Sequence, residues 1–364
     1  MSENQETQLQ FYTQLSEEEV LVRLWQAKRT LGKTALILGH HYQSDAVIQY
    51  ADYRGDSLEL SRRAAMVKEA KCIVFCGVRF MAESAAILGG EHQVVLHPAP
   101  EAGCPLADFA QLEDVERAWD ALQAAGAERL IPITYVNSSA DVKAFCGQRG
   151  GLTCTSSNVA KVLSWALGHN RTVLFLPDEN LGRNTARALG LPPTEIATWD
   201  FMLDQGGHDK ADLPHYRLFV WKGYCHVHTR FSLMDVARVR QESPHAQIVV
   251  HPECLPPVVE ASDASGSTSF IVRAVHQAPA GACLAIGTEI NLVGRLAKEH
   301  PDKTVLPLSR SLCPNMFRVN IYRLLHTLES IIAGEPVNTV HVPEETVAFA
   351  RQALERMLAF SAKD

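Results

Sequence analysis

Reactive side chains gather in short polar segments that follow apolar stretches of the chain. Histidine, glutamate and tyrosine, the usual groups for general acid–base catalysis, occur there beside serine, threonine and cysteine. The segments are His40-His41-Tyr42, Gly103-Cys104-Pro105, Tyr135-Val136-Asn137, Cys154-Thr155-Ser156, His251-Pro252-Glu253 and Gly266-Ser267-Thr268. Their number and placement indicate one active site assembled from several parts of the chain.

Nine cysteines are spread along the chain, and the default role of any one of them is that of a small buried hydrophobe. Their odd number argues against a disulfide framework. The proline after Cys104 and after Cys313 favours a loop at both cysteines, and a Cys-Pro pair also ends bacterial ferredoxin motifs. Three isolated cysteines would leave one iron of a cubane cluster without a protein ligand. Such an open position is what a Lewis-acid metal requires.

Two segments also have simpler interpretations. Cys225-His226-x-His228 resembles half of a zinc site, although no second group of ligands follows at a familiar spacing. His40-His41-Tyr42 could be a strand end whose side chains only cap a helix. The residues alone leave both alternatives open.

Ser57, Ser156 and Thr268 each stand near the start of an expected helix. The simple interpretation is N-capping, for which serine, threonine and aspartate are the usual residues. The alternative is anion binding, because free N–H groups and the helix dipole attract negative charge. Three such places, all at strand ends, favour a polyanionic substrate.

The elements that position these segments alternate as short apolar strands and amphipathic helices. Strands without polar alternation are typical of parallel sheets covered on both faces, and ligands bind beyond the carboxyl ends of such strands. The expected strands span residues 35–38, 72–76, 94–96, 130–135, 173–176, 248–250, 284–286 and 305–308. The expected helices span residues 57–70, 112–126, 159–168, 233–242 and 290–300.

A chain of 364 residues predicts two or three domains, and breaks rich in proline and glycine near residues 98–106 and 206–214 favour several small ones. Residues 204–215 look like a surface insertion, and the last 50 residues contain helical patterns only. The net charge of −7 provides no basic field for nucleic acid or an acidic membrane. Residues 1–20 read as a disordered or frayed leader without a signal core, and we expect a cytoplasmic protein.

Taken in order, the polar segments resemble the quinolinate synthases, the A proteins of NAD biosynthesis. The similar motifs cover nearly everything from about residue 30 to residue 335. They are Gly39-His40-His41-Tyr42-Gln43, Gly55-Asp56-Ser57-Leu58, Phe80-Met81-Ala82-Glu83, Cys104-Pro105-Leu106-Ala107, Tyr135-Val136-Asn137, Cys154-Thr155-Ser156, Cys225-x-Val227-His228, His251-Pro252-Glu253-Cys254, Gly266-Ser267-Thr268, Gly287-Thr288-Glu289 and Cys313.

The resemblance implies an α/β fold of three similar three-layer αβα domains with small parallel sheets, in a pseudo-threefold arrangement around a central iron–sulfur active site. The implied domains are residues 21–108 with the C-terminal helices 314–364, residues 109–224, and residues 225–313. Each domain then gives one cysteine ligand to a [4Fe–4S] cluster with one open iron. The implied ligands are Cys104, Cys225 and Cys313.

The resemblance also implies a reaction, in which iminoaspartate condenses with dihydroxyacetone phosphate and the product closes to quinolinate with loss of phosphate and water. The open iron would act as a Lewis acid in the dehydration, and an L-aspartate oxidase or dehydrogenase would supply iminoaspartate. The implied roles are proton transfer for His40 and Tyr42, general base for Glu253 with His251 beside it, substrate orientation for Tyr135 and Asn137, and binding of phosphate or carboxylates for Ser57, Ser156 and Thr268. His40, His251 and Glu253 would also contact the substrate.

Three features depart from the pattern of that family. His41 stands where many members have asparagine, Cys313 has no neighbouring cysteine for a redox disulfide, and residues 191–224 are longer than in compact members. Two other functions would use a similar cluster. A redox sensor would need neither His251 and Glu253 nor three anion sites, and only the resemblance separates quinolinate formation from another cluster-dependent hydro-lyase reaction on a carboxylic acid.

Overall fold

The computed structural model describes residues 9–127 and 129–361. The described chain divides into two compact units. The first contains the residues up to Cys104 together with Cys313–Pro343, and the second contains Pro105–Leu312 and the residues from Glu344 onward. No helix in these described ranges has the length and apolar character needed to cross a membrane.

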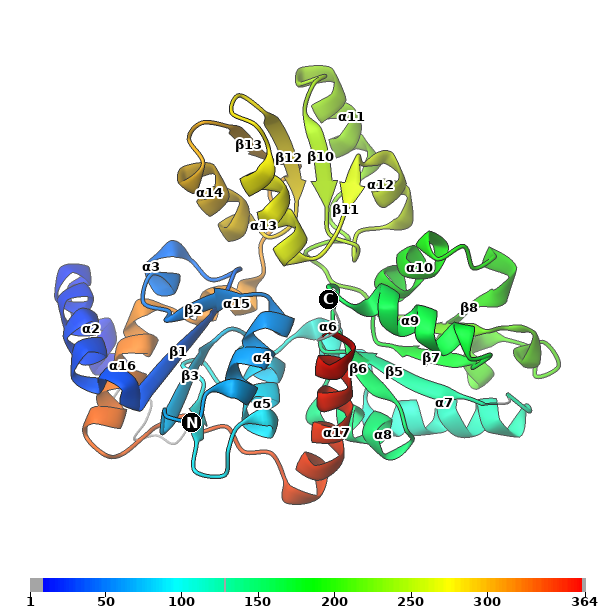
Figure 1. Ribbon diagram of the computed structural model, residues 1–364, viewed down its shortest axis with the longest axis horizontal. Coiled ribbons are helices and arrows are strands. Elements are labelled where there is room, and N and C mark those ends of the chain that lie inside the picture. The colour runs from blue at the N-terminus through cyan, green and yellow to red at the C-terminus, as the bar shows by residue number, and fades with distance from the viewer. Residues whose placement is uncertain (1–8, 128, 362–364) are drawn as a thin grey trace. The chain divides into compact units, whose positions relative to one another are not determined.

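Three small parallel sheets, each flanked by helices, form the α/β fold, which confirms the predicted class (Figure 1). The first unit holds the sheet β2-β1-β3-β4, and the second unit holds β6-β5-β7-β9-β8 and β11-β10-β12-β13. The strands are β1 (Ala35–His40), β2 (Tyr53–Gly55), β3 (Cys72–Cys76), β4 (Val94–Leu96), β5 (Ile131–Tyr135), β6 (Leu152–Cys154), β7 (Val173–Leu176), β8 (Ile196–Trp199), β9 (Leu218–Trp221), β10 (Gln247–Val250), β11 (Ala264–Ser265), β12 (Cys283–Gly287) and β13 (Thr304–Pro307).

The three sheets share one strand order. In each, the first strand along the chain lies between the second and the third, and a further strand pairs with the third. The five-stranded sheet adds β8 at its edge, and β8 and β9 both come from the segment 191–224. This repeated order is what three similar αβα domains require. The pseudo-threefold arrangement and the three domain ranges stay predictions.

The helices of the first unit are α2 (Glu17–Leu31), α3 (Asp45–Ile48), α4 (Ser57–Met66), α5 (Arg79–Leu88), α15 (Pro314–Arg318) and α16 (Ile321–Ile332). Those of the second unit are α6 (Pro105–Asp108), α7 (Leu112–Ala124), α8 (Ala140–Gln148), α9 (Val159–Gly168), α10 (Glu179–Ala188), α11 (Leu233–Glu242), α12 (Pro256–Ala261), α13 (Thr268–Gln277), α14 (Ile290–Glu299) and α17 (Glu344–Ser361). The expected helices over 159–168 and 233–242 match α9 and α11 residue for residue.

Both ends of the described chain differ in detail from the expected organisation. Residues 1–8 of the expected leader lie outside the described residues, whereas residues 17–20 belong to α2, where Val20 is fully buried. The C-terminal helices separate: α16 packs against α2 in the first unit, while α17 packs against α8 and β6 in the second (Figure 1). The apolar stripe of α17, which includes Ala353 and Leu354, is buried there.

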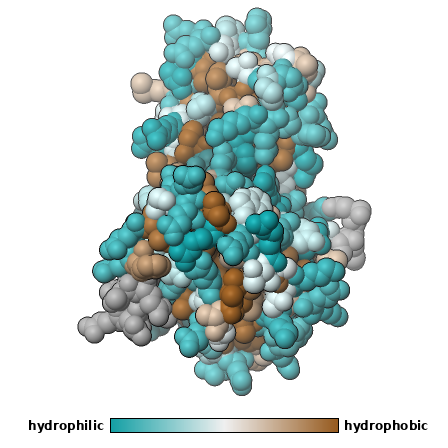
Figure 2. Space-filling model, turned by 90° about the vertical axis from the view of Figure 1, so that its left-hand side faces the viewer, coloured by the Kyte–Doolittle hydropathy of each residue, from teal (hydrophilic) through white to brown (hydrophobic). Residues whose placement is uncertain are grey.

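Each sheet has its own apolar core. The core of the first unit joins β1 and β3 to α2 and α16, and separate cores lie in the five-stranded sheet and in the last four-stranded sheet. Figure 2 shows one face of the molecule, on which hydrophilic residues predominate and hydrophobic residues show through only in narrow strips. Among the residues coloured on that face there is no broad apolar patch of the kind that marks a docking surface.

Candidate active site

A buried glutamate lies between two histidines at the carboxyl end of β10 in the second unit. His251 and Glu253 follow β10 directly, and His228 lies in the turn before α11. Oε2 of Glu253 lies 2.7 Å from Nδ1 of His228 and 3.0 Å from Nδ1 of His251. The two rings stack with their centroids 4.2 Å apart, and none of the three residues is more than 2% exposed. The structure thus assembles one carboxylate and two imidazoles into a single buried cluster.

Burial and mutual contacts set the charges in this cluster. Burial alone would raise the pKa of Glu253, but the charges and hydrogen bonds of His228 and His251 outweigh burial and hold that pKa below its usual range. Burial, reinforced by His251, lowers the pKa of His228 to about 4. Near neutral pH, an ionised Glu253 therefore faces a neutral His228. A carboxylate of low pKa is a weak base, so the arrangement favours Glu253 as the group that orients the two imidazoles.

The second oxygen of Glu253 is available for a ligand. Oε1 is buried and has no hydrogen-bond partner among the described residues. Buried polar atoms are nearly always paired with protein or with bound water, so an unpaired carboxylate oxygen indicates a place where a ligand or water binds. Across the cluster, Nε2 of His228 lies 3.1 Å from Oγ1 of Thr288, a residue of the Gly287-Thr288-Glu289 motif.

Cys225 lies beside this cluster. Ligand atoms of Cys225, His228 and Glu253 all lie within 4.8 Å of one another, as a zinc site at Cys225-His226-x-His228 would require. Both ring nitrogens of His228, however, already lie within hydrogen-bond distance of Glu253 and Thr288. Ligation of a metal ion by His228 would break one of these contacts. The arrangement therefore favours Cys225 as a metal ligand with the other two residues next to the metal.

Burial separates the cysteines into inert and accessible groups. Burial raises the pKa of five thiols, which therefore keep their protons: Cys72, Cys76, Cys146, Cys154 and Cys254. The partly exposed cysteines are Cys104, Cys225, Cys283 and Cys313. Cys283 is the first residue of β12 and so stands at the end of the sheet opposite to the polar segments. The remaining three are the predicted cluster ligands, and their accessibility fits ligation of iron by cysteine.

Parallel pairing brings the predicted residues together in the same way in each sheet. His40 pairs with Gly55, Tyr135 with Cys154, and Val250 with Ser265. In each sheet the second of these paired strands is followed within three residues by a predicted anion-binding hydroxyl: Ser57, Ser156 and Thr268, respectively. Each sheet therefore places candidate acid–base or orienting groups beside one hydroxyl at the carboxyl ends of its strands, where ligands bind in such folds.

The capping interpretation of Ser57 and Thr268 is wrong, because the preceding residue caps each helix. Asp56 caps α4, where its carboxylate accepts two backbone N–H groups in a capping box. Ser267 caps α13, where its hydroxyl accepts one backbone N–H group. Ser57 and Thr268 are the first residues inside these helices.

Ser156 does not act as a cap either. In the turn before α9, Oγ1 of Thr155 accepts a hydrogen bond from the backbone of Ser157, and Oδ1 of Asn158 accepts one from the backbone of Thr155. The hydroxyl of Ser156 takes no part in these contacts, and the residue is half-buried. Its predicted role in anion binding stays a prediction.

Asn137, in the loop after β5, has an unpaired hydrogen-bond acceptor. Its Oδ1 is buried and has no hydrogen-bond partner among the described residues. The loop is held in place by Ser138, whose Oγ donates to the carbonyl of Tyr135 at 2.8 Å. The fully buried Lys143 donates from Nζ to the carbonyl of Ser138 at 2.5 Å. A fixed loop with an unpaired amide oxygen suits the predicted task of orienting a substrate.

In the first unit, His40 and Tyr42 contact each other at the end of β1. Their rings meet edge to face with centroids 4.7 Å apart. The backbone N–H of Tyr42 donates to Nδ1 of His40 at 3.2 Å, so Nδ1 acts as an acceptor and carries no proton. His41 has Nε2 4.0 Å from Oε2 of Glu59 on α4. His40 and Tyr42 are buried and act as one local pair, whereas His41 faces α4.

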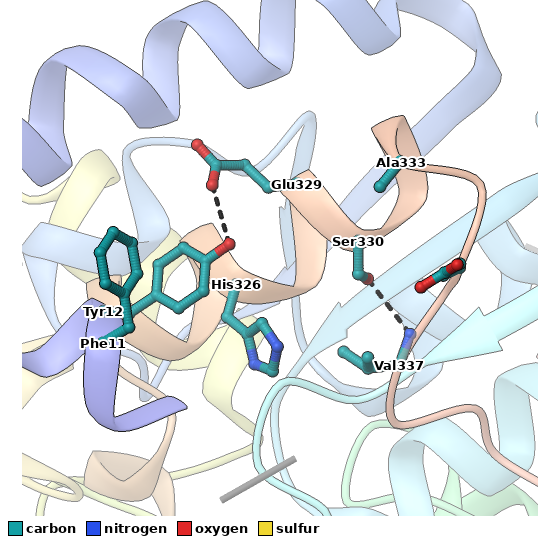
Figure 3. Close-up of a pocket in the computed structure, with 8 residues that line it drawn as sticks. Phe11, Tyr12, His326, Glu329, Ser330, Ala333 and Val337 are labelled. Atoms are coloured by element: carbon teal, nitrogen blue, oxygen red, sulfur yellow. Dashed lines mark hydrogen bonds between the residues drawn. The ribbon is translucent and has the colours of Figure 1, made fainter. Parts of the chain in front are cut away.

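A separate cavity of about 310 Å³ lies in the first unit between the N-terminal residues and α16 (Figure 3). Oη of Tyr12 donates to Oε2 of Glu329 at 2.9 Å, and Oγ of Ser330 accepts the N–H of Val337 at 3.1 Å. None of the predicted site residues lines this cavity. It is therefore not the candidate active site.

Comparison with known proteins identifies the family of the chain. The family model described as the quinolinate synthetase A protein matches residues 23–359. The chain belongs to this family. A quinolinate synthase of Anoxybacillus flavithermus is 45% identical over 361 residues, which are 99% of this chain and 98% of that protein. A quinolinate synthase of a Geobacillus species is 47% identical over 96% of both chains, and one of Corynebacterium glutamicum is 46% identical over 96% of this chain and 89% of its own.

Membership of the quinolinate synthase family confirms the resemblance drawn from the motifs. The predicted site omitted His228, although the spacing Cys225-x-x-His228 was a signal for it. It also omitted Thr288 and Asn184, whose contacts with the cluster or its loops come from elements far away in the sequence. The individual roles of the predicted residues stay predictions.

Proposed function

We propose that this chain catalyses the formation of quinolinate from iminoaspartate and dihydroxyacetone phosphate, with loss of phosphate and water, in NAD biosynthesis. The observation that carries the proposal is the buried cluster of Glu253, His228 and His251 beside Cys225, in a chain that belongs to the quinolinate synthase family. Such a reaction requires several proton transfers in a site that excludes water, and this cluster is suited to them.

The cofactor in this proposal is a [4Fe–4S] cluster held by Cys104, Cys225 and Cys313. When bound, it supplies an iron without a protein ligand, which acts as a Lewis acid and assists the departure of hydroxide. The accessibility of these three thiols supports this ligand set, and the proposal requires that they meet at one cluster. The substrate iminoaspartate comes from an L-aspartate oxidase or dehydrogenase.

Side chains of the protein carry out proton transfer, substrate orientation and anion binding. His228 and His251 transfer protons to and from the substrate carbon or nitrogen, while ionised Glu253 orients them and stabilises the charge that they acquire. Tyr42 and His40 transfer protons during isomerisation and ring closure. Asn137 accepts a hydrogen bond from the substrate through its unpaired Oδ1, with Tyr135 beside it. Ser57, Ser156 and Thr268 bind the phosphate and the carboxylates.

Anaerobic purification followed by iron and sulfide analysis and an assay for quinolinate tests the proposal. We expect about four irons and four sulfides per chain, following the cluster composition, and quinolinate that depends on both substrates. Exposure to air should abolish activity and release iron, because the iron without a protein thiolate is held most weakly. A chain that binds no iron, or that forms no quinolinate when its cluster is intact, would contradict the proposal.

Alanine substitutions at neighbouring positions should separate anion binding from helix capping. Asp56→Ala should lower the free energy of unfolding by about 0.5–2 kcal/mol, because Asp56 caps α4. Ser57→Ala should leave the melting temperature nearly unchanged but weaken the binding of phosphate-bearing analogues roughly tenfold or more, the worth of a hydrogen bond to a charged group. Melting curves and inhibition constants measure both effects.

A second matched pair and a second type of ligand control this comparison. Thr268→Ala and Ser267→Ala form the same pairing of binding residue and cap on α13. At least one of the alanine variants at Ser57, Ser156 and Thr268 should lose affinity for phosphate-bearing analogues. That same variant should bind dicarboxylate analogues without phosphate as tightly as wild type does. Inhibition constants equal to wild type in all three variants would mean that the phosphate binds elsewhere.

A further inference from the structure

Helix α10 contacts both loops of the candidate site in the second unit, although it carries none of the predicted site residues. It follows β7 of the five-stranded sheet, whereas the Glu253 loop follows β10 of the other sheet in that unit. Nδ2 of Asn184 on α10 lies 2.8 Å from the carbonyl oxygen of Pro252 and 2.8 Å from that of Cys254. These two carbonyl groups stand on either side of Glu253.

The two contacts fix the orientation of the Asn184 amide. Carbonyl oxygens only accept hydrogen bonds, so the group between them must be the NH₂ of the amide and not its oxygen. Both N–H groups of one side chain are thereby used on the backbone that brackets Glu253. Within the loop itself, the N–H of Cys254 donates to the carbonyl of His251 at 3.0 Å. Asn184 therefore ties this turn to α10, in addition to the bond from the N–H of His251 to the carbonyl of Gly287 at the end of β12.

The start of α10 holds the Cys225 loop in a similar way. Asp178, the residue before the helix, is fully buried and caps it by accepting the N–H of Leu181 at 2.7 Å. The same carboxylate also accepts the backbone N–H of Cys225. The N–H of Glu179, the first residue of α10, donates to the carbonyl of Gly223 at 2.9 Å. One helix is thus bonded to the backbones of both loops that meet at the cluster.

We propose that Asn184 is a positioning residue that holds the backbone of Glu253 so that its carboxylate reaches both imidazoles, with α10 as the common support of the Cys225 and Glu253 loops. One carboxylate oxygen that lies 2.7 and 3.0 Å from two ring nitrogens tolerates little displacement of the loop. Functional groups must be held to within about 0.5 Å for productive geometry. The kinetic part of this inference rests on the proposed function, and the structural part does not.

The variant Asn184→Asp has nearly the same shape but replaces two donors by oxygens that face carbonyl groups. We expect kcat for quinolinate to fall roughly 10²-fold, as for a misplacement of about 1 Å, with little change in KM. In the Glu253→Gln background the same substitution should cause almost no further fall, because its effect passes through Glu253. Should Asn184→Asp fail to fold, Asn184→Ala removes the same two donors without adding a charge.

The matched control is Arg187→Gln, one turn further along α10. Arg187 forms an ion pair with Glu260 of α12, so it links the same two elements at their exposed surface without touching the Glu253 loop. Its kcat and KM should equal those of wild type. If Arg187→Gln and Asn184→Asp lower kcat equally, or if the Asn184 effect is undiminished in the Glu253→Gln background, Asn184 has only a general structural role and the proposal is overturned.

The two hydrogen bonds from Asn184 to the carbonyls of Pro252 and Cys254 are called the clamp below. Hydrogen exchange of the holoenzyme tests this clamp without any assay of activity. In Asn184→Asp, the backbone amides within 251–255, which exclude Pro252, should exchange about tenfold faster, whereas those of β7 should keep their wild-type rates. If wild type forms no quinolinate but exchange rises only at 251–255, the proposed function fails and the clamp is supported. Unchanged exchange at 251–255 overturns the clamp whatever the chain catalyses.

Discussion

Serine in place of Cys225 should abolish the iron–sulfur chromophore, whereas serine in place of Cys254 should leave it intact. The two cysteines lie in the same unit, close to Glu253, but they differ in accessibility. Cys225 is partly exposed and has its sulfur near His228 and Glu253, whereas Cys254 is fully buried and burial raises the pKa of its thiol well above the usual value. A thiol that keeps its proton in an apolar setting does not bind iron as a thiolate. Only Cys225 is therefore expected to be a ligand.

Visible absorption and iron and sulfide contents after anaerobic purification measure this outcome. Cys104→Ser and Cys313→Ser should behave like Cys225→Ser, because a cluster with one open iron has no ligand to spare. Melting temperatures separate loss of the cluster from loss of the fold. A full cluster in Cys225→Ser, or a colourless but folded Cys254→Ser, would contradict the ligand assignment.

Glutamine in place of Glu253 should lower turnover by about 10²–10⁴-fold while the iron content stays at the wild-type level. The substitution keeps the shape of the side chain but removes its charge. In the native chain, one carboxylate oxygen faces the Nδ1 atoms of two imidazoles, His228 and His251. The neutral amide no longer stabilises an imidazolium, and its NH₂ group cannot accept a hydrogen bond from either ring. Both imidazoles then become weaker bases and lose their fixed orientation.

Steady-state turnover measured beside iron content and melting temperature checks this result. Glu260→Gln, at an exposed position on α12, removes a carboxylate seven residues further along the chain and should leave turnover unchanged. Near-normal turnover in Glu253→Gln would transfer the proton chemistry to Tyr42 and His40 of the first unit. Tyr42→Phe, which removes one hydroxyl and little volume, would then show the large fall instead.

The sequence by itself determined the fold class, the main strands and the family. Central strands such as β3 and β7 are apolar along their whole length and buried at every residue, so their pattern was readable without a structure. Short edge strands such as β2 and β11 were not predicted, because two or three residues carry no periodicity and only pairing with β1 or β10 makes them strands. β8 and β9 were not predicted either, although each has four residues and β9 lies between β7 and β8 inside its sheet.

For the candidate site, the sequence indicated which residue types carry chemistry but not which of them are partners. Asp56, rather than Ser57, caps α4 because its backbone is extended at φ −82° and ψ 179°, and a shift of one residue cannot be read from composition. His228 and His251 are 23 positions apart in the sequence, yet their rings stack and share Glu253 because two loops meet at one sheet edge. Asn184 lies still further away along the chain, and only packing of α10 against the loop after β10 brings its amide to Pro252 and Cys254. Local pattern specifies elements, whereas contacts between distant residues depend on the free energy of the whole folded chain, which is why tertiary structure alone decided these partners.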